Sequence, residues 1–345
     1  MRVGAEMLDA VLASGATSVA IVGTGKNVGK TVTMRALYEA AIERGLRVGL
    51  VSAGRDGEAL DVIEHHRKPR LWLYPGTWIV TTPEMLSHAG EDVELERIAT
   101  ACGPLRRARV SKAAFYELIG PPTASGVRTA IQALQERCEL VLVDGAIDRL
   151  ATISTGEDAV IVACGAAAAA SEEAALEDVR ALVARLRIPR FDEREPLLRV
   201  EGALFPDVAE RLIASEEVRQ VVVHSPAFVM LTGKSLSRAA SRLRLRCEHP
   251  VRVVAATIAS IGPHRRFEPR AFLDAVGETT GLPTYDVYAG AAAGRETIRT
   301  LGEGPESDEF IVMRGELAGD LPSGVRVLRE EPTYLLCERS ETWTR

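Results

Sequence analysis

The stretch from residue 18 to residue 44 constrains the fold of this chain more than any other. Residues 18–22 form a short apolar, β-branched run, typical of a strand buried on both faces. Residues 23–31 follow with the sequence Gly-Thr-Gly-Lys-Asn-Val-Gly-Lys-Thr. Residues 31–44 then place apolar side chains at helical spacing (Met34, Leu37, Ala41). The segment therefore predicts a strand, a glycine-rich turn and a helix in immediate succession.

This succession is typical of a phosphate-binding loop, and its residue types match what phosphate binding requires. Glycines allow successive backbone N–H groups to point at a phosphate, and the helix N-terminus adds partial positive charge. Lys30 is predicted to place its ammonium between the β- and γ-phosphates, and Thr31 to ligate Mg²⁺. We expect ATP and Mg²⁺ as ligands, with the nucleotide bound by the residues Gly25, Lys26, Asn27, Val28, Gly29, Lys30, Thr31 and Val32.

The loop is one residue longer than the common pattern, because Thr24 stands where a glycine is expected and the nearest glycine is Gly23. The form Gly-Thr-x-x-x-Val-Gly-Lys-Thr resembles the loop of dethiobiotin synthetase and of the related cobyrinic acid a,c-diamide synthases. The resemblance implies a P-loop NTPase that uses Mg-ATP to activate a small carboxylate. It also implies a possible homodimer, since relatives in this group often build their sites at dimer interfaces.

Two aspartates are candidates for completing the metal site. Asp144 ends a buried run, and the segment 142–146 resembles the Val-Glu-Gly-Ala-Gly segment of dethiobiotin synthetases, where the acid lies near the metal. The alternative is that Asp144 only caps the next turn. Asp56 follows the second predicted strand, where it is either a further metal ligand or a turn residue. Lys30 and Asp144 are the predicted catalytic residues.

Charge and hydropathy exclude several classes of protein. The net charge of −6 and a pI near 5.7 argue against sequence-independent nucleic-acid binding, which depends on a basic surface. No apolar run of 18 residues occurs, so no membrane span is expected. The first residues lack the pattern of a signal peptide, so we expect a cytoplasmic protein.

Alternating strand and helix patterns predict an α/β fold with a mostly parallel, doubly wound sheet. The expected P-loop NTPase domain spans residues 1–290, with insertions near 55–125 and 190–250, and residues 291–345 form a small β-rich appendage. Expected helices cover 5–14, 31–44, 92–101, 123–137, 166–187 and 269–280. Expected strands cover 18–22, 47–52, 71–74, 78–82, 106–110, 139–144, 158–164, 200–204, 218–224, 252–258, 284–288, 310–314, 325–328 and 334–337.

Three positions qualify the resemblance. Dethiobiotin synthetases carry a substrate-holding lysine at the end of the second strand, where this chain has Ser52. An asparagine-containing turn meets the adenine in that family, whereas Thr257 and Ser260 occupy the corresponding neighbourhood here. The biotin-pathway reaction is therefore not expected, and the choice between ATP and GTP stays open, with the absence of an Asn-Lys-x-Asp motif favouring ATP.

Cys164, followed by a glycine at a strand end, has the pattern of a nucleophile elbow, with His224 or His249 as its base. The alternative is a small buried cysteine without a chemical role.

Two functions are compatible with these observations. In the first, an ATP-dependent enzyme activates a small carboxylate-type acceptor held between the nucleotide site and residues 55–125. In the second, an accessory NTPase drives maturation or reactivation of a metal- or corrinoid-dependent protein client. The missing lysine at Ser52 and the extra segments 190–250 and 310–345 motivate the second hypothesis.

Overall fold

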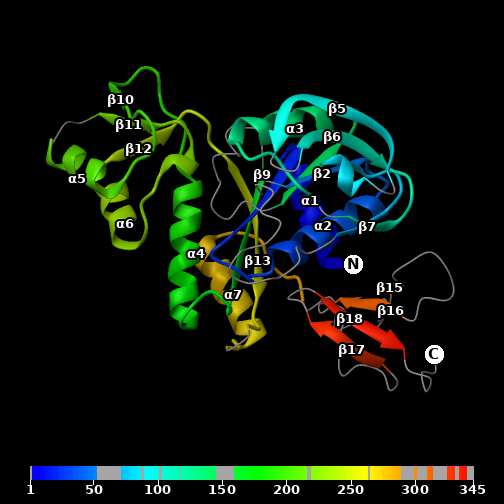
Figure 1. Ribbon diagram of the computed structural model, residues 1–345. Helices are drawn as coiled ribbons and strands as arrows, with labels where there is room; N and C mark the ends of the chain where they lie inside the picture. The colour runs from blue at the N-terminus through cyan, green and yellow to red at the C-terminus, as the bar shows by residue number, and fades with distance from the viewer. Residues whose placement is uncertain are drawn as a thin grey trace.

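The computed structural model describes residues 2–52, 71–86, 89–100, 103–116, 118–144, 159–215, 219–262, 265–288, 299–300, 309–313, 325–330 and 334–339. Most of these residues build one large α/β unit, with a smaller α/β unit beside it (Figure 1). Within the described residues, no helix is both long and apolar enough to cross a bilayer.

A nine-stranded sheet forms the centre of the large unit, in the order β14-β13-β9-β1-β8-β2-β4-β6-β5. The strands from β14 to β4 run parallel, and β6 is antiparallel to both of its neighbours. This confirms the predicted mostly parallel sheet. Its strands are β1 (Ser18–Gly23), β2 (Val48–Ser52), β4 (Trp78–Thr81), β5 (Ala89–Thr100), β6 (Gly103–Val110), β8 (Leu140–Asp144), β9 (Ala159–Gly165), β13 (Arg252–Ala259) and β14 (Thr284–Asp286).

Helices cover both faces of this sheet because its strands are apolar on both sides. Val19 and Ile21 of β1 belong to a core cluster with α1 (Arg2–Ala13) and α2 (Lys30–Glu43). Ala20 and Val22 belong to the cluster on the other face. The helices on that other face are α3 (Ala124–Gln135), α4 (Glu172–Leu186) and α7 (Pro269–Thr280).

Helix ends lie where side chains can satisfy the terminal backbone groups. The Thr123 hydroxyl accepts a hydrogen bond from the Gly126 amide at 3.1 Å, and the Ser171 hydroxyl accepts one from the Ala174 amide at 3.2 Å. Gly281 ends α7 in the left-handed conformation that favours glycine.

The cap at Ser171 also corrects a prediction. Residues 166–170 do not open the alanine-rich helix, because that helix begins only after its serine cap.

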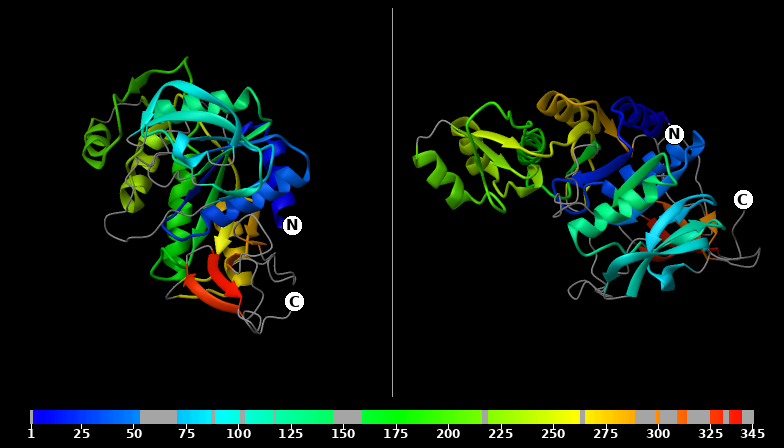
Figure 2. Two further views of the ribbon diagram at one scale, coloured as in Figure 1. Left: turned by 45° about the vertical axis from the view of Figure 1, so that its right-hand side comes forward. Right: turned by 90° about the horizontal axis from the view of Figure 1, so that it is seen from above.

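Residues 188–250 fold around a separate core beside the main sheet. The strands β10 (Leu197–Arg199), β11 (Gln220–Val223) and β12 (Arg244–Cys247) form a parallel sheet with α5 (Pro206–Ala214) and α6 (Gly233–Arg242). Figures 1 and 2 show this small unit projecting from one side of the main sheet. The strand predicted at 200–204 is therefore wrong in position, since β10 ends at Arg199, and none of the three strands joins the main sheet.

The last described strands form a four-stranded sheet of their own. The strands β15 (Arg299–Thr300), β16 (Glu309–Met313), β18 (Tyr334–Arg339) and β17 (Val325–Glu330) pair antiparallel in that order. The three strands predicted in this region are confirmed, while the proposed domain boundary at residue 290 stays a prediction. The remaining elements are β3 (Leu71–Leu73), β7 (Ala114–Tyr116), and the 3₁₀ turns η1 (Pro83–Met85) and η3 (Pro226–Phe228).

The helix predicted at residues 92–101 is wrong, because this segment is the outer strand β5. Val93 and Leu95 alternate with Glu94 and Glu96, a period of two that suits a strand. The segment pairs with β6 as an antiparallel hairpin at both of its ends, and local helix propensity does not take such pairing into account.

Gly120 lies where the chain closes over the carboxyl end of β2. A Cβ atom at this position would lie 1.6 Å from the Ser52 carbonyl oxygen, which is backbone and has no rotamer to change. We expect Gly120→Ala to reduce the free energy of unfolding by about 3 kcal/mol. Urea denaturation followed by circular dichroism measures this loss.

Gly277→Ala is the matched control. Gly277 lies within α7, and its added Cβ would meet Thr284 at an ordinary 3.5 Å, so helix propensity should stabilise the variant by up to about 1 kcal/mol. Equal stabilities for the Gly120 variant and the wild type would contradict the close approach at Ser52.

Candidate functional site

The turn between β1 and α2 has the backbone conformation that the sequence predicts. Gly29 precedes α2 with φ 89° and ψ 10°, a left-handed conformation that a side chain would strain. Asn27, with φ 59°, is the one non-glycine residue with positive φ in the described part of the chain. Asparagine tolerates this region better than most residues. The first helical hydrogen bond runs from the Thr33 amide to the Gly29 carbonyl at 2.8 Å.

Gly23 and Gly25 are required for a different reason, because other atoms approach them closely. A Cβ on Gly23 would lie 2.6 Å from Val28 Cγ2 and 3.1 Å from Lys30 Nζ. A Cβ on Gly25 would lie 2.5 Å from the Cβ of Ala168. Larger residues at these two positions would push the loop away from the lysine and from its neighbouring loop.

Lys30 begins α2, and its ammonium folds back over the loop. Its Nζ donates a hydrogen bond to the Gly25 carbonyl at 2.5 Å, so the positive charge lies inside the curve of the backbone. The Lys26 and Asn27 side chains are exposed, whereas Val28 is fully buried and anchors the loop to the core. The half-buried Thr31 and Val32 follow in the first turn of α2, where helix N–H groups and a threonine hydroxyl are available to an anion and its counterion.

Asp144 ends β8, the strand that lies between β1 and β2. Val143 of β8 pairs with Ala20 of β1, and Asp144 is the next residue along β8. On the other side of β8, Asp144 pairs with Ser52 of β2. The half-buried Asp144 carboxylate therefore lies at the same carboxyl edge as the glycine loop, on the adjacent strand. This is the edge at which open parallel sheets bind ligands. Asp56, the other predicted metal ligand, lies outside the described residues.

Ser52 is buried beneath the segment that leads into α3. Its side chain is 2% exposed, and Gly120 lies directly against its carbonyl oxygen. The neighbouring Ile119 amide donates to the Thr81 hydroxyl at 3.0 Å, which holds this segment over the ends of β2 and β4. The carboxyl end of β2 is therefore closed at Ser52.

Two further segments lie against the glycine loop, the turn after β9 and the end of β13, and neither was predicted from the sequence. Ala166, Ala167 and Ala168 follow β9 as a turn, with Ala168 against Gly25. The end of β13 also lies close, since a Cβ on Gly29 would lie 3.4 Å from the Ala259 Cβ. The segment after β13 approaches the alanine turn, because a Cβ on Gly262 would lie 2.7 Å from the Ala167 amide nitrogen. The run of small residues directly after a buried strand was the available signal, since close backbone approach requires such residues.

Tyr288 is a further neighbour of the loop that the sequence analysis did not identify. A Cβ on Gly29 would lie 3.5 Å from its ring and 3.8 Å from its hydroxyl, and burial raises the pKa of this tyrosine. Its amide donates to the Asp286 carboxylate at 2.9 Å. An aromatic side chain thus lies beside the first turn of α2.

Thr257, predicted near a nucleotide base, instead joins α2 to β13. Its hydroxyl lies 2.9 Å from the hydroxyl of Thr33, and both side chains are fully buried. Ser260 is also buried, with 3% of its surface exposed. Neither side chain is exposed to a ligand in this conformation.

Cys164 does not form a nucleophile elbow. Its side chain is fully buried within β9, and its thiol contacts the Ala175 carbonyl at 3.5 Å. Burial raises the pKa of this thiol to about 12. His224 and His249, the bases considered for it, lie instead beside each other in the small unit. The sequence pattern was misleading because a cysteine at the end of a strand, followed by glycine, can point either to the core or to the solvent.

The comparisons with known proteins agree with this geometry. Residues 9–60 match the family model of the P-loop domain of DUF1611, a domain of unknown function. The chain carries a P-loop domain. The matched residues contain β1, the glycine loop and α2, which is the part that a P-loop requires. The chain matched no curated protein and no solved structure.

Burial of Cys164 predicts an unreactive thiol in the folded protein. With a pKa of about 12, only about one thiol in 10⁴ is ionised at pH 8, and the side chain is closed to reagents. We expect iodoacetamide at pH 8 to modify the Cys164 peptide only after unfolding in guanidinium, as read by mass spectrometry. Rapid modification of the native protein at this residue would contradict the structural role.

Proposed function

We propose that this protein is a nucleoside triphosphatase that binds Mg-ATP at the P-loop and the adjacent end of β8. The observation that carries the proposal is the position of Lys30 Nζ inside the loop, at the Gly25 carbonyl, beside the N-terminus of α2. A fixed ammonium and a helix N-terminus directed to one point form a site suited to a polyphosphate. The match of residues 9–60 to a P-loop domain supports the same proposal.

Each residue of the site has a distinct role in this proposal. Lys30 neutralises charge that develops on the transferred phosphoryl group, and Thr31 ligates Mg²⁺. Asp144 completes the metal shell from the neighbouring strand, either directly or through water. Backbone N–H groups of the glycine loop bind the phosphates, and Tyr288 provides an aromatic surface beside them.

The reaction we propose first is ATP-dependent activation of a small carboxylate, with transfer of the γ-phosphoryl group to a carboxylate oxygen and release of ADP. The acceptor would lie at the carboxyl edge of the sheet, next to the ends of β8 and β2. Because Ser52 is buried and no lysine stands there, the acceptor must differ from the substrate of dethiobiotin synthetases.

The second candidate is an accessory NTPase whose hydrolysis drives maturation or reactivation of a metal- or corrinoid-dependent enzyme. The favouring observation is the small unit of residues 188–250, which has its own core cluster and projects from the main sheet. Such a unit offers a surface to a protein client without altering the nucleotide site. The buried Ser52 also fits a protein that has no small substrate to hold.

Hydrolysis of ATP and GTP with Mg²⁺ tests the common part of both candidates. Lys30→Ala should reduce the turnover number by at least about 10²-fold, because it removes a cation from the transition state. Asp144→Asn should reduce turnover and raise the Mg²⁺ concentration needed for half-maximal rate. A coupled assay for phosphate release measures both effects.

Lys234→Ala is the matched control for Lys30→Ala. Lys234 also lies in a Gly-Lys-Ser sequence at the start of a helix, but it is exposed and follows no buried strand and glycine loop. We expect unchanged turnover in this variant. Full activity in Lys30→Ala, or equal losses in the two lysine variants, would refute the proposed nucleotide site.

Stimulation experiments separate the two candidates. A small carboxylic acid that raises ADP release would identify an acceptor, and this effect should vanish in Lys30→Ala. Stimulation by a co-purified protein, with none from small acids, would favour the accessory role. Stimulation by a protein should also depend on the small unit. Alanine substitutions on the exposed surface of this unit should weaken the stimulation and leave basal hydrolysis unchanged.

A further inference from the structure

The small unit brings three potential metal ligands together at the carboxyl ends of its strands. His224 directly follows β11, and Glu248 and His249 directly follow β12. The strand pairing continues past both ends, with hydrogen bonds of 3.0 Å from the Glu248 amide to the Val223 carbonyl and from the His249 amide to the His224 carbonyl. The backbone therefore determines how these three residues lie relative to one another.

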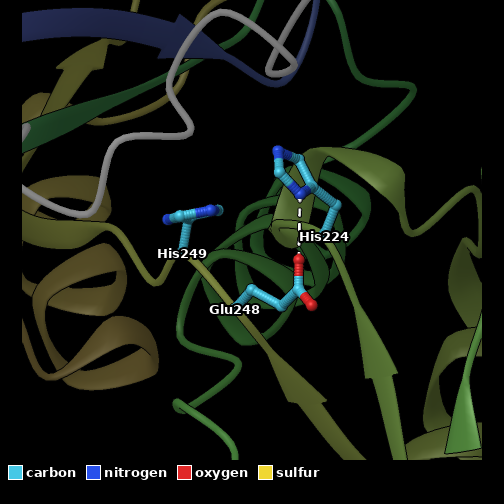
Figure 3. A group of neighbouring side chains, drawn as sticks. All are labelled: His224, Glu248 and His249. Atoms are coloured by element: carbon cyan, nitrogen blue, oxygen red, sulfur yellow. Dashed lines mark hydrogen bonds and ion pairs between the residues drawn. The ribbon is translucent and has the colours of Figure 1, made fainter.

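Their side chains converge, as Figure 3 shows. His224 Nδ1 lies 3.1 Å from Glu248 Oε2, and the two imidazole rings meet edge to face with centroids 4.7 Å apart. One ligand atom from each residue lies within 4.8 Å of the other two. All three residues are half-buried, so the cluster is open to solvent on one side.

The contacts around the cluster favour a ligand more than a purely structural network. Arg199, at the end of β10, donates to Glu248 Oε1 at 2.9 Å, which orients the carboxylate and directs Oε2 to His224. The His249 ring has no hydrogen-bond partner among the residues that the structure describes. The chain has six histidines, and the structure describes two of them, His224 and His249. Both lie in this cluster.

We propose that His224, Glu248 and His249 bind a divalent transition metal ion of the zinc class, as a three-ligand site with room for a water molecule or a further ligand. Two imidazoles and one carboxylate are a ligand set that such ions prefer. In a tetrahedral site with metal–ligand bonds of about 2.0–2.1 Å, the ligand atoms lie about 3.3 Å apart. The pair formed by His224 and Glu248 already has this spacing, and rotation of the half-exposed His249 ring brings in the third ligand.

Glu248 has a second role in this site, because it supplies the negative charge. Arg128 of α3 and Arg190 both act electrostatically on His249, and Arg199 contacts the carboxylate itself. A divalent cation bound only by neutral imidazoles would be repelled by the positive charges of these arginines, with no negative charge nearby to offset the repulsion. We therefore expect Glu248→Gln to weaken metal binding strongly, although the glutamine has nearly the same shape.

Isothermal titration of the full-length, nucleotide-free protein with Zn²⁺ tests the proposal, after the affinity tag is removed and the protein is dialysed against EDTA. We expect one ion per chain and a visible absorption band when Co²⁺ is used as the spectroscopic probe. His224→Gln, His249→Gln and Glu248→Gln should each lower the affinity by at least about 10-fold. Circular dichroism and thermal unfolding verify that each variant is folded.

Two controls identify the site that binds the ion. Replacing His65 and His66 by glutamine leaves the three cluster residues unchanged in sequence, and should leave the affinity unchanged. Asp144→Asn removes the acid proposed for the nucleotide site, and should also bind Zn²⁺ normally. Because this binding needs no nucleotide, its outcome is independent of the NTPase proposal.

The remaining outcomes would overturn the proposal. Absence of stoichiometric binding by the wild type would do so, as would equal affinities in the wild type and the three cluster variants. Loss of binding in Asp144→Asn, with retention in the cluster variants, would assign the ion to the P-loop site instead. If a histidine variant fails to fold, Glu248→Gln alone decides, since its side chain is nearly isosteric and only its charge is lost.

Discussion

The close approach of three loops at one edge of the main sheet is the constraint on which the rest of the structure depends. Gly25 meets Ala168, and Gly165 meets both Ala259 and the backbone of Val28. The first contact joins the glycine loop to the turn after β9, and the other two join the end of β9 to the end of β13 and to the glycine loop. Small residues are required at these positions because side-chain volume would separate the loops. The position of the Lys30 ammonium is thus determined by packing that lies outside the P-loop motif itself.

The layers beneath this edge explain why the loop can be held so firmly. The strand β1 lies between β9 and β8 at the centre of the parallel sheet, and its alternate residues enter the two core clusters. The fully buried Val28 continues this anchoring into the loop, and the buried hydroxyl pair of Thr33 and Thr257 joins α2 to β13. A loop that binds a highly charged ligand benefits from this rigidity, because preorganised dipoles need not reorient when the ligand binds.

The chain uses the same geometric principle at two places. In the main sheet, Asp144 ends a parallel strand and Lys30 begins the helix after another. In the small sheet, His224 follows one parallel strand, and Glu248 and His249 follow the next. Parallel strands present the turns after their carboxyl ends on one side, where side chains from several strands can meet. The two sites differ in chemistry, since one offers cations and helix N–H groups and the other offers imidazole and carboxylate. An anion and a metal cation are the ligands that we propose for the two sites.

The sequence by itself determined the local features of this protein. The strand, glycine loop and helix of residues 18–44 and the helix at 269–280 follow from periodicity, caps and glycine conformation, which depend on neighbours along the chain. The position of Asp144 at the carboxyl end of a buried strand was also predicted, because an apolar run leads directly into it.

Only the tertiary structure decided the features that depend on contacts between distant residues. Residues 89–100 became a strand because they pair with β6, and the Cys164 thiol is buried because α4 covers it. Ser52 was closed by Gly120, and His224 met Glu248 and His249 because β11 and β12 pair in one particular register. The contacts of Cys164, Ser52 and His224 join residues from 11 to 68 positions apart. Local propensity contains no information about them, because the free energy that selects them comes from packing and hydrogen bonding across the folded chain.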